Sequence, residues 1–148
     1  FRSTQGLEIN DGMTLCFHTM TLPDANLVWH CPYVVLYYSD DGKVGGKNYR
    51  QYTFFKLNGE DNGSNEYAEN IFSMHHSENF ESWKKWNDLN KAGYECKIKF
   101  NKKGGRISLK TENVGIAIEN TTKILDVKDQ VFVALTGDQC ALTDIRIF

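Results

Sequence analysis

The sequence lacks the features that would assign it to a membrane or to a nucleic acid. No apolar run approaches the ~18 residues of a membrane-spanning helix. Its 17 basic and 19 acidic residues are intermixed and leave a net charge of −2, which gives nucleic-acid binding no electrostatic support. The 148 residues are 41% hydrophobic and 24% charged, a composition that excludes disorder. We therefore interpret residues 1–148 as a single globular domain with its own core.

Motifs of common catalytic sites are also missing. The sequence contains no G-x-S-x-G, no H-E-x-x-H and no Walker A motif. The acid pairs Glu60 with Asp61 and Glu78 with Glu81 are expected as solvated residues in a turn and at a helix start. A glycosidase needs two opposed carboxyl groups, which spacing alone cannot establish. A hydrolase therefore ranks last among the functions considered, and we expect no enzyme.

Cysteines are few and widely spaced. The sequence has Cys16, Cys31, Cys96 and Cys140 but no C-x-x-C, so it carries no transition-metal signature. Two disulfides are possible, although a chain of this length does not need them. Each cysteine lies in or beside an apolar stretch, where a free thiol packs as a small hydrophobic group. Buried free thiols are the favoured reading, and the disulfides stay open.

Strand patterns dominate what is present. In YECKIKF (94–100), Tyr94, Cys96, Ile98 and Phe100 alternate with charged residues, which is typical of a strand with one wet face. About eight such strands, separated by short turns, predict an all-β fold, an antiparallel β-sandwich of jelly-roll type. The expected strands are residues 13–22, 31–38, 48–57, 94–100, 105–111, 114–120, 130–137 and 140–148.

One short helix interrupts the strands. NFESWKKWNDLNKAG (79–93) spaces Phe80, Trp83, Trp86 and Leu89 three residues apart and ends at a glycine. We expect this helix to plug one end of the core. Because Trp83 continues the register of Phe80, we predict that Trp83 is more buried than Trp86.

The aromatic residues suggest a binding surface. In NYRQYTFFKL (48–57), strict alternation would place Arg50, Tyr52, Phe54 and Lys56 on an outward face. In PYVVLYY (32–38), either alternate set could face the core. Sugar rings stack their C–H faces on aromatic planes, while polar groups around them bind the hydroxyls. Most single Tyr and Phe residues are nevertheless core residues, so the two readings remain side by side.

The predicted site combines the start of one strand with the outward face of another. Pro32 pushes Cys31 toward an extended backbone and so holds Trp29 and His30 at a strand mouth. Trp29, Arg50 and Tyr52 are predicted to form the floor of the site, with the loop residues Asp61 and Asn62 on its rim. The full set of predicted ligand-binding residues is Trp29, His30, Tyr38, Arg50, Tyr52, Asp61 and Asn62.

A structural calcium ion is a further expectation. Glu8, Asp11 and Asp144 lie near the two ends of the chain, and such segments commonly pair as neighbouring strands in sandwiches. Calcium needs only oxygen ligands from loops and strand ends. The alternative is that all three acids are simply solvated.

Several stretches resemble known proteins. WHCPYVVLYYSDDGKVGGKNYRQYTFFKLNG (29–59) resembles a jelly-roll carbohydrate-binding module found beside bacterial glucanases. The stretches WHCP, TENVGIAI and VALTGDQCALTDIRI are similar to extracytoplasmic N-terminal domains of clostridial signalling proteins, diguanylate cyclases among them. The loop after Leu57 lacks a tryptophan that the glucanase modules often carry there.

The resemblance implies an extracytoplasmic, non-catalytic domain that binds a glucan-type oligo- or polysaccharide. It would act as a sensor or targeting module of a larger bacterial protein, monomeric when isolated, reaching a membrane only through that parent. The start at Phe1, without a methionine or a signal peptide, fits an excised domain. The alternative is an interaction module of a signalling protein with no small ligand.

Overall fold

The computed structural model describes residues 3–25, 27, 30–126 and 129–148. Within them the chain forms ten strands and one helix. In chain order these are β1 (Leu7–Glu8), β2 (Thr14–Thr21), β3 (Pro32–Tyr38), β4 (Arg50–Lys56), β5 (Ala68–His76), α1 (Trp83–Ala92), β6 (Tyr94–Lys103), β7 (Arg106–Asn113), β8 (Ile116–Ile124), β9 (Phe132–Gly137) and β10 (Cys140–Ile147). No helix in this part of the chain has the length and apolar character needed to cross a membrane.

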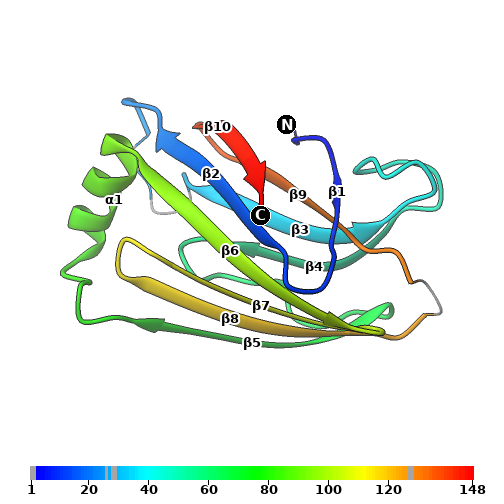
Figure 1. The fold of residues 1–148 in the computed structure, drawn as a ribbon. Helices are drawn as coiled ribbons and strands as arrows, with labels where there is room; N and C mark the ends of the chain where they lie inside the picture. The colour runs from blue at the N-terminus through cyan, green and yellow to red at the C-terminus, as the bar shows by residue number, and fades with distance from the viewer. Residues whose placement is uncertain (1–2, 26, 28–29, 127–128) are drawn as a thin grey trace.

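The strands build two antiparallel sheets that pack face to face. Sheet A has the order β1-β9-β3-β4, and sheet B has the order β10-β2-β6-β7-β8-β5. The chain passes between the sheets several times, and α1 lies at one end of the sandwich (Figure 1). The predicted all-β sandwich with one short helix is confirmed. Strands β1 and β5 were not predicted from the sequence.

The main core lies between the two sheets, and strand alternation supplies it. Its fully buried members come from both sheets and include Phe17, Val34, Leu36, Phe55, Ile98, Phe100, Ile107 and Val133. All four cysteines are free thiols, as expected. Burial raises the pKa of Cys31 and of Cys96 to about 12, so both thiols stay protonated at neutral pH.

Helix α1 packs on the core through Trp86, which is 1% exposed, whereas Trp83 is 36% exposed. The prediction that Trp83 is the more buried tryptophan was therefore wrong. The helix begins at Trp83, after an N-cap at Ser82 whose hydroxyl accepts from the amide of Lys85. Phe80 precedes the helix, so the register read from Phe80 does not continue into it.

The outer face of sheet A is covered by a second apolar cluster. Val35, Tyr37 and Ala134 are buried there beneath Val44, Tyr49, Phe54 and Phe132. The Tyr37 hydroxyl donates to the carbonyl of Gly42, 2.5 Å away, which ties the loop after β3 onto this face. At the edge of the sheet, the amide of Thr4 donates to the carbonyl of Leu135 and so continues the pairing of β1 with β9. The inner face of sheet A lies against sheet B and contributes Val34, Leu36 and Phe55 to the main core. Sheet A is consequently buried on both faces over much of its area.

The outer face of sheet B, in contrast, is exposed to solvent. Strand β6 alternates strictly, with Cys96, Ile98 and Phe100 buried and Lys97 and Lys99 exposed. Strand β5 forms the far edge of this sheet. It escaped prediction because its pattern is inverted: Ile71 is 76% exposed, while the polar Asn70 is half-buried.

Candidate functional site

A β-bulge in the pairing of β3 with β4 determines which of the predicted site residues lie close together. Between Leu36 and Tyr37 the pairing with β4 skips one residue, so Leu36 faces Thr53 but Tyr37 faces Gln51. The skipped residue, Tyr52, turns inward beside Thr53, and both are buried. The bulge shifts the alternation by one, which sends Arg50 inward as well. The prediction that Tyr52 lies on an exposed outward face was therefore wrong.

Arg50 and Tyr52 instead converge on Asp126 at the end of the sandwich opposite α1. The Arg50 guanidinium lies 2.6 Å from a carboxylate oxygen of Asp126 and 5.5 Å from the centroid of the Tyr67 ring. The Tyr52 hydroxyl donates to the same carboxylate at 3.1 Å. Burial raises the pKa of Tyr52, and the charge of Asp126 raises it further. This network lies at one end of the core, and its polar groups bond to one another.

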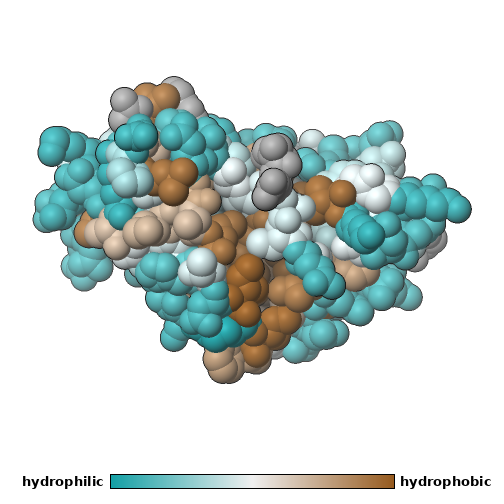
Figure 2. Space-filling model, turned by 90° about the horizontal axis from the view of Figure 1, so that it is seen from above, coloured by the Kyte–Doolittle hydropathy of each residue, from teal (hydrophilic) through white to brown (hydrophobic). Residues whose placement is uncertain are grey.

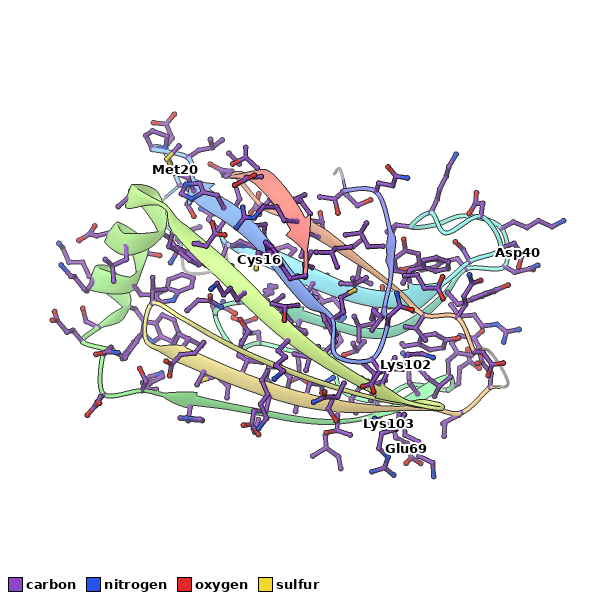
Figure 3. The ribbon with its side chains drawn as sticks, in the orientation of Figure 1. Cys16, Met20, Asp40, Glu69, Lys102 and Lys103 are labelled. Carbon is purple, nitrogen blue, oxygen red and sulfur yellow. The ribbon has the colours of Figure 1, made fainter. Side chains whose placement is uncertain are left out.

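Tyr38 lies at the edge of the same cluster, since its partner across the sheet is Arg50. Its hydroxyl donates to Asp40 at 2.8 Å, and the side-chain amide of Asn48 donates to the other oxygen of that carboxylate. Figure 3 labels Asp40 in the loop that follows β3. The hydrogen bond to Asp40 raises the pKa of Tyr38.

His30 lies away from this cluster, because β3 separates the two places. His30 precedes β3 and Tyr38 ends it, and seven extended residues span roughly 20 Å. The His30 ring is buried, with Nε2 3.2 Å from a carboxylate oxygen of Asp138 and Nδ1 accepting from the amide of Leu27. Trp29, the predicted centre of the floor, lies outside the described residues.

Asp61 and Asn62 run along the free edge of β4. Asp61 forms a bridge with Phe55, and the amide of Asn62 donates to the carbonyl of Phe54. Both residues are exposed. They are thus neighbours of the middle of β4 rather than of Arg50. The structure therefore divides the predicted site into three places: the end cluster, the surroundings of His30 and the β4 edge.

The outer face of sheet A brings together aromatic rings that the sequence did not place. Tyr33 and Phe54 pack edge to face with centroids 5.5 Å apart, and the Lys56 ammonium lies 5.3 Å from the centroid of the Tyr33 ring. Tyr49 is half-buried, and its hydroxyl donates to the side chain of Gln51 at 3.2 Å. Strand alternation places Tyr33, Phe54 and Lys56 outward, as the pairings of Val35 with Phe54 and of Tyr33 with Lys56 require. We call Tyr33, Tyr49, Gln51, Phe54 and Lys56 the aromatic face.

A small pocket opens in the aromatic face. Its volume is about 60 Å³, and its walls are Ser3, Val35, Val44, Tyr49, Gln51, Phe54 and Thr136. The space is too small for a whole sugar ring but fits a methyl group or the C–H edge of one. Gln51 and Thr136 add polar groups to its apolar walls. The sequence contained part of this signal, because Phe54 and Lys56 were placed outward correctly. Tyr33 was missed because the core side of PYVVLYY could not be chosen. Tyr49 and Gln51 were missed because strict alternation, without the bulge at Tyr52, put them on the opposite side from Phe54.

The predicted calcium ligands each have a different partner. Glu8 accepts from the side chain of Gln130, and Asp11 accepts from the amide of Lys102 and pairs with the ammonium of Lys103. Asp144 pairs with Arg146. Among the described residues, no three His, Cys, Asp or Glu side chains are arranged to hold a metal ion. The structure gives the predicted calcium site no support.

No family model matches the chain, and no curated protein is significantly similar to it.

Proposed function

We propose that the aromatic face binds a neutral carbohydrate and that the domain acts by binding alone. The observation that carries this proposal is the row of partly covered rings around a small pocket, on an outer sheet face flanked by Gln51 and Lys56. Aromatic rings with a few convergent polar groups are the usual composition of a small-ligand site.

The recognition follows from the chemistry of the two partners. The C–H face of a pyranose stacks on Phe54 and Tyr49, which removes apolar surface of both from water. Gln51 and Lys56 supply donors for the sugar hydroxyls, and the exposed Asp61 and Asn62 lie along the same strand. The aromatic rings are held by packing against buried Tyr37 and Val35, so they lose little freedom on binding.

The wider setting rests on the sequence resemblance. The similarity to carbohydrate-binding modules and to extracytoplasmic domains of clostridial signalling proteins supports a glucan-type ligand and a place outside the cytoplasm. In this proposal the domain is the sensor or targeting module of a larger bacterial protein. The parent's other domains would use the bound sugar as a signal or as an anchor.

The test is calorimetry with β-glucan and xyloglucan oligosaccharides. Phe54→Ala should weaken binding about tenfold to a hundredfold, because one stacked ring is worth ~1–3 kcal/mol. Trp83→Ala is the matched control, since it removes an exposed ring from α1, outside the aromatic face. Binding that survives both Phe54→Ala and Tyr49→Ala in a folded protein would exclude this face. If Trp29→Ala abolishes binding and the variants of the aromatic face do not, the site lies at the start of β3, as the sequence predicted.

A second candidate function is binding of a partner protein. Strand β10 is an edge strand of sheet B, and Ile145, Ile147 and Phe148 are exposed on or beside it. Figure 2, seen from the side where β10 lies in Figure 1, shows hydrophobic surface in the middle of that face. An exposed apolar edge is a template for another chain. Concentration-dependent sedimentation that Ile147→Lys abolishes would support this candidate.

A further inference from the structure

The outer face of sheet B carries a stripe of cations. Strand alternation and register place Lys97, Lys99, Lys103, Arg106, Lys110 and Lys123 on this face, and we call them the basic stripe. They come from β6, β7 and β8, the three central strands between β2 and β5. Figure 3 labels Lys103 at the end of β6.

The stripe contains like charges in direct opposition. Lys99 faces Lys110, Lys103 faces Arg106, and Arg106 also faces Lys123 across the next strand. Opposed like charges destabilise a sheet. Stability alone therefore does not explain these pairs in a chain that also contains 19 acidic residues. Two cations are neutralised locally: Lys110 lies 3.6 Å from Glu119, and Lys103 lies 2.6 Å from Asp11. Within the described chain, Lys97 and Lys99 have no carboxylate at ion-pair distance.

The same face is hollowed. A groove of about 600 Å³ is lined by side chains of both charges, among them Lys97, Lys99, Lys110, Glu112 and Glu119, and by Thr14. It adjoins a second hollow of about 490 Å³ that shares Thr14 and Lys97 and extends to Arg146 on β10, whose guanidinium is paired with Glu95 and Asp144. Together they form a continuous path across the strands, in the size range of ligand sites. Lys97 and Lys99, which have no carboxylate at ion-pair distance within the described chain, therefore lie in a recess that also contains acidic and hydroxyl side chains.

We propose that this groove binds a linear acidic polysaccharide, whose carboxylate or sulfate groups pair with Lys97 and Lys99 and replace Glu119 as the partner of Lys110. Neighbouring cations are about 5 Å apart across strands and roughly 6.8 Å apart along one, so successive sugar units can each meet one. Glu112, Glu119 and the Thr14 hydroxyl provide acceptors for sugar hydroxyls. This site lies on the opposite outer face from the aromatic face and does not depend on it.

Two other polyanions fit the groove less well. Single nucleic-acid strands rely on stacking of bases on aromatic rings, and the described residues lining the two hollows offer only the rings of His75 and Phe148. The carboxylates of Glu112 and Glu119 would also repel closely spaced phosphates. An anionic membrane is flat, whereas the lysines lie in a recess. A flexible chain with both hydroxyls and well-separated charges suits the mixed lining best.

The test measures binding of polygalacturonate and dextran sulfate to the whole domain by calorimetry, with neutral dextran, duplex DNA and anionic vesicles as comparisons. We expect an acidic polysaccharide to bind and its affinity to fall at least tenfold between 50 and 500 mM salt, through screening. The double variant Lys99→Gln/Lys110→Gln should lose at least tenfold in affinity. It should melt at about the same temperature, because removal of the opposed like-charge pair offsets the loss of the weak, exposed ion pair between Lys110 and Glu119.

The matched control is Lys84→Gln/Lys85→Gln on α1. It removes the same charge and likewise breaks one exposed ion pair, that of Lys84 with Asp88. We expect its affinity to change less than twofold. If the two double variants lose equal affinity for the acidic polysaccharide, the effect comes from net charge alone, and the proposed site is wrong. Absence of binding to both acidic polysaccharides, or tighter binding of DNA or vesicles, would overturn the proposed ligand. Phe54→Ala should leave this binding unchanged, which separates it from the neutral-sugar proposal.

Discussion

The two sheets differ in what covers their outer faces. In sheet A, the outward Tyr37 is fully buried beneath a loop and neighbouring rings, as deeply as any residue of the main core. In sheet B, the outward Lys97 and Lys99 are exposed, and the face is hollowed and charged. The same architecture thus gives one face suited to apolar contact and one suited to ionic contact. Each face is proposed to bind a different class of sugar.

The largest expected effect tests whether the covered face is a core. Tyr37→Ala removes a fully buried ring and should lower the free energy of unfolding by ~3–5 kcal/mol. Lys97→Ala, at an outward position of sheet B, should change it by no more than about 0.5 kcal/mol. Urea unfolding of both variants measures the difference. Similar small effects would mean that the outer face of sheet A contributes no core.

Alkaline pH sharpens the same comparison. Burial raises the pKa of Tyr33 and of Tyr37 to about 12, from an ordinary value near 10. The folded state therefore holds these protons more tightly, and the unfolded chain ionises first. Stability from this source is complete below about pH 10 and is lost as the pH rises toward 12, by roughly 1 kcal/mol per pH unit and group. Urea midpoints between pH 8 and 11 should fall, and Tyr37→Phe should flatten the decline. A slope unchanged by that variant would place the Tyr37 hydroxyl in water.

A smaller effect tests the bulge that separates the two sides of β4. Tyr52→Phe deletes the hydroxyl that donates to Asp126 and should cost ~1 kcal/mol. Because Tyr52 faces inward, the same variant should leave sugar binding at the aromatic face unchanged. Calorimetry beside urea unfolding checks both outcomes. A stable variant with weakened sugar binding would restore the outward position that strict alternation predicted.

The smallest effect concerns the wet face alone. Lys99→Glu converts the opposed pair Lys99 and Lys110 into an opposite-charge pair, which should stabilise the domain by ~0.2–1 kcal/mol. The gain should shrink at high salt, since exposed charges are screened. Thermal melting at two salt concentrations measures it. No gain at low salt, or a gain that high salt does not reduce, would show that the two side chains do not interact.

The contrast between the faces also explains what the sequence could predict. Strands with one solvent-exposed face, such as β6, show a clear alternation of polar and apolar residues in the sequence. Their inward residues were predicted correctly. Strand β3 is buried on both faces, so PYVVLYY contains no polar residue that marks a side. The bulge at Tyr52 leaves no mark in the sequence either, because any residue type can be the inserted one. For that reason the fold class was predictable, whereas the outward set of β4 was only half right.

The helix error has a similar origin. A spacing of three residues indicates a shared side only within a continuous helix, and the sequence does not fix where α1 begins. Ser82 is the N-cap, which leaves Trp83 in the exposed first turn and makes Trp86 the buried contact. Serine followed by an apolar residue is a typical N-cap signal and could have identified this start.

Chemical-shift mapping by NMR during titration with a neutral β-glucan oligosaccharide tests the central claim most directly. The account predicts that the amides of Tyr33, Tyr49, Gln51 and Phe54 shift in a saturable way, while those of Lys97, Lys99 and Lys110 do not. Titration with oligogalacturonate should reverse the pattern. Shifts confined to the surroundings of His30 and Trp29, or spread equally over both outer faces, would contradict the assignment of neutral-sugar binding to the aromatic face.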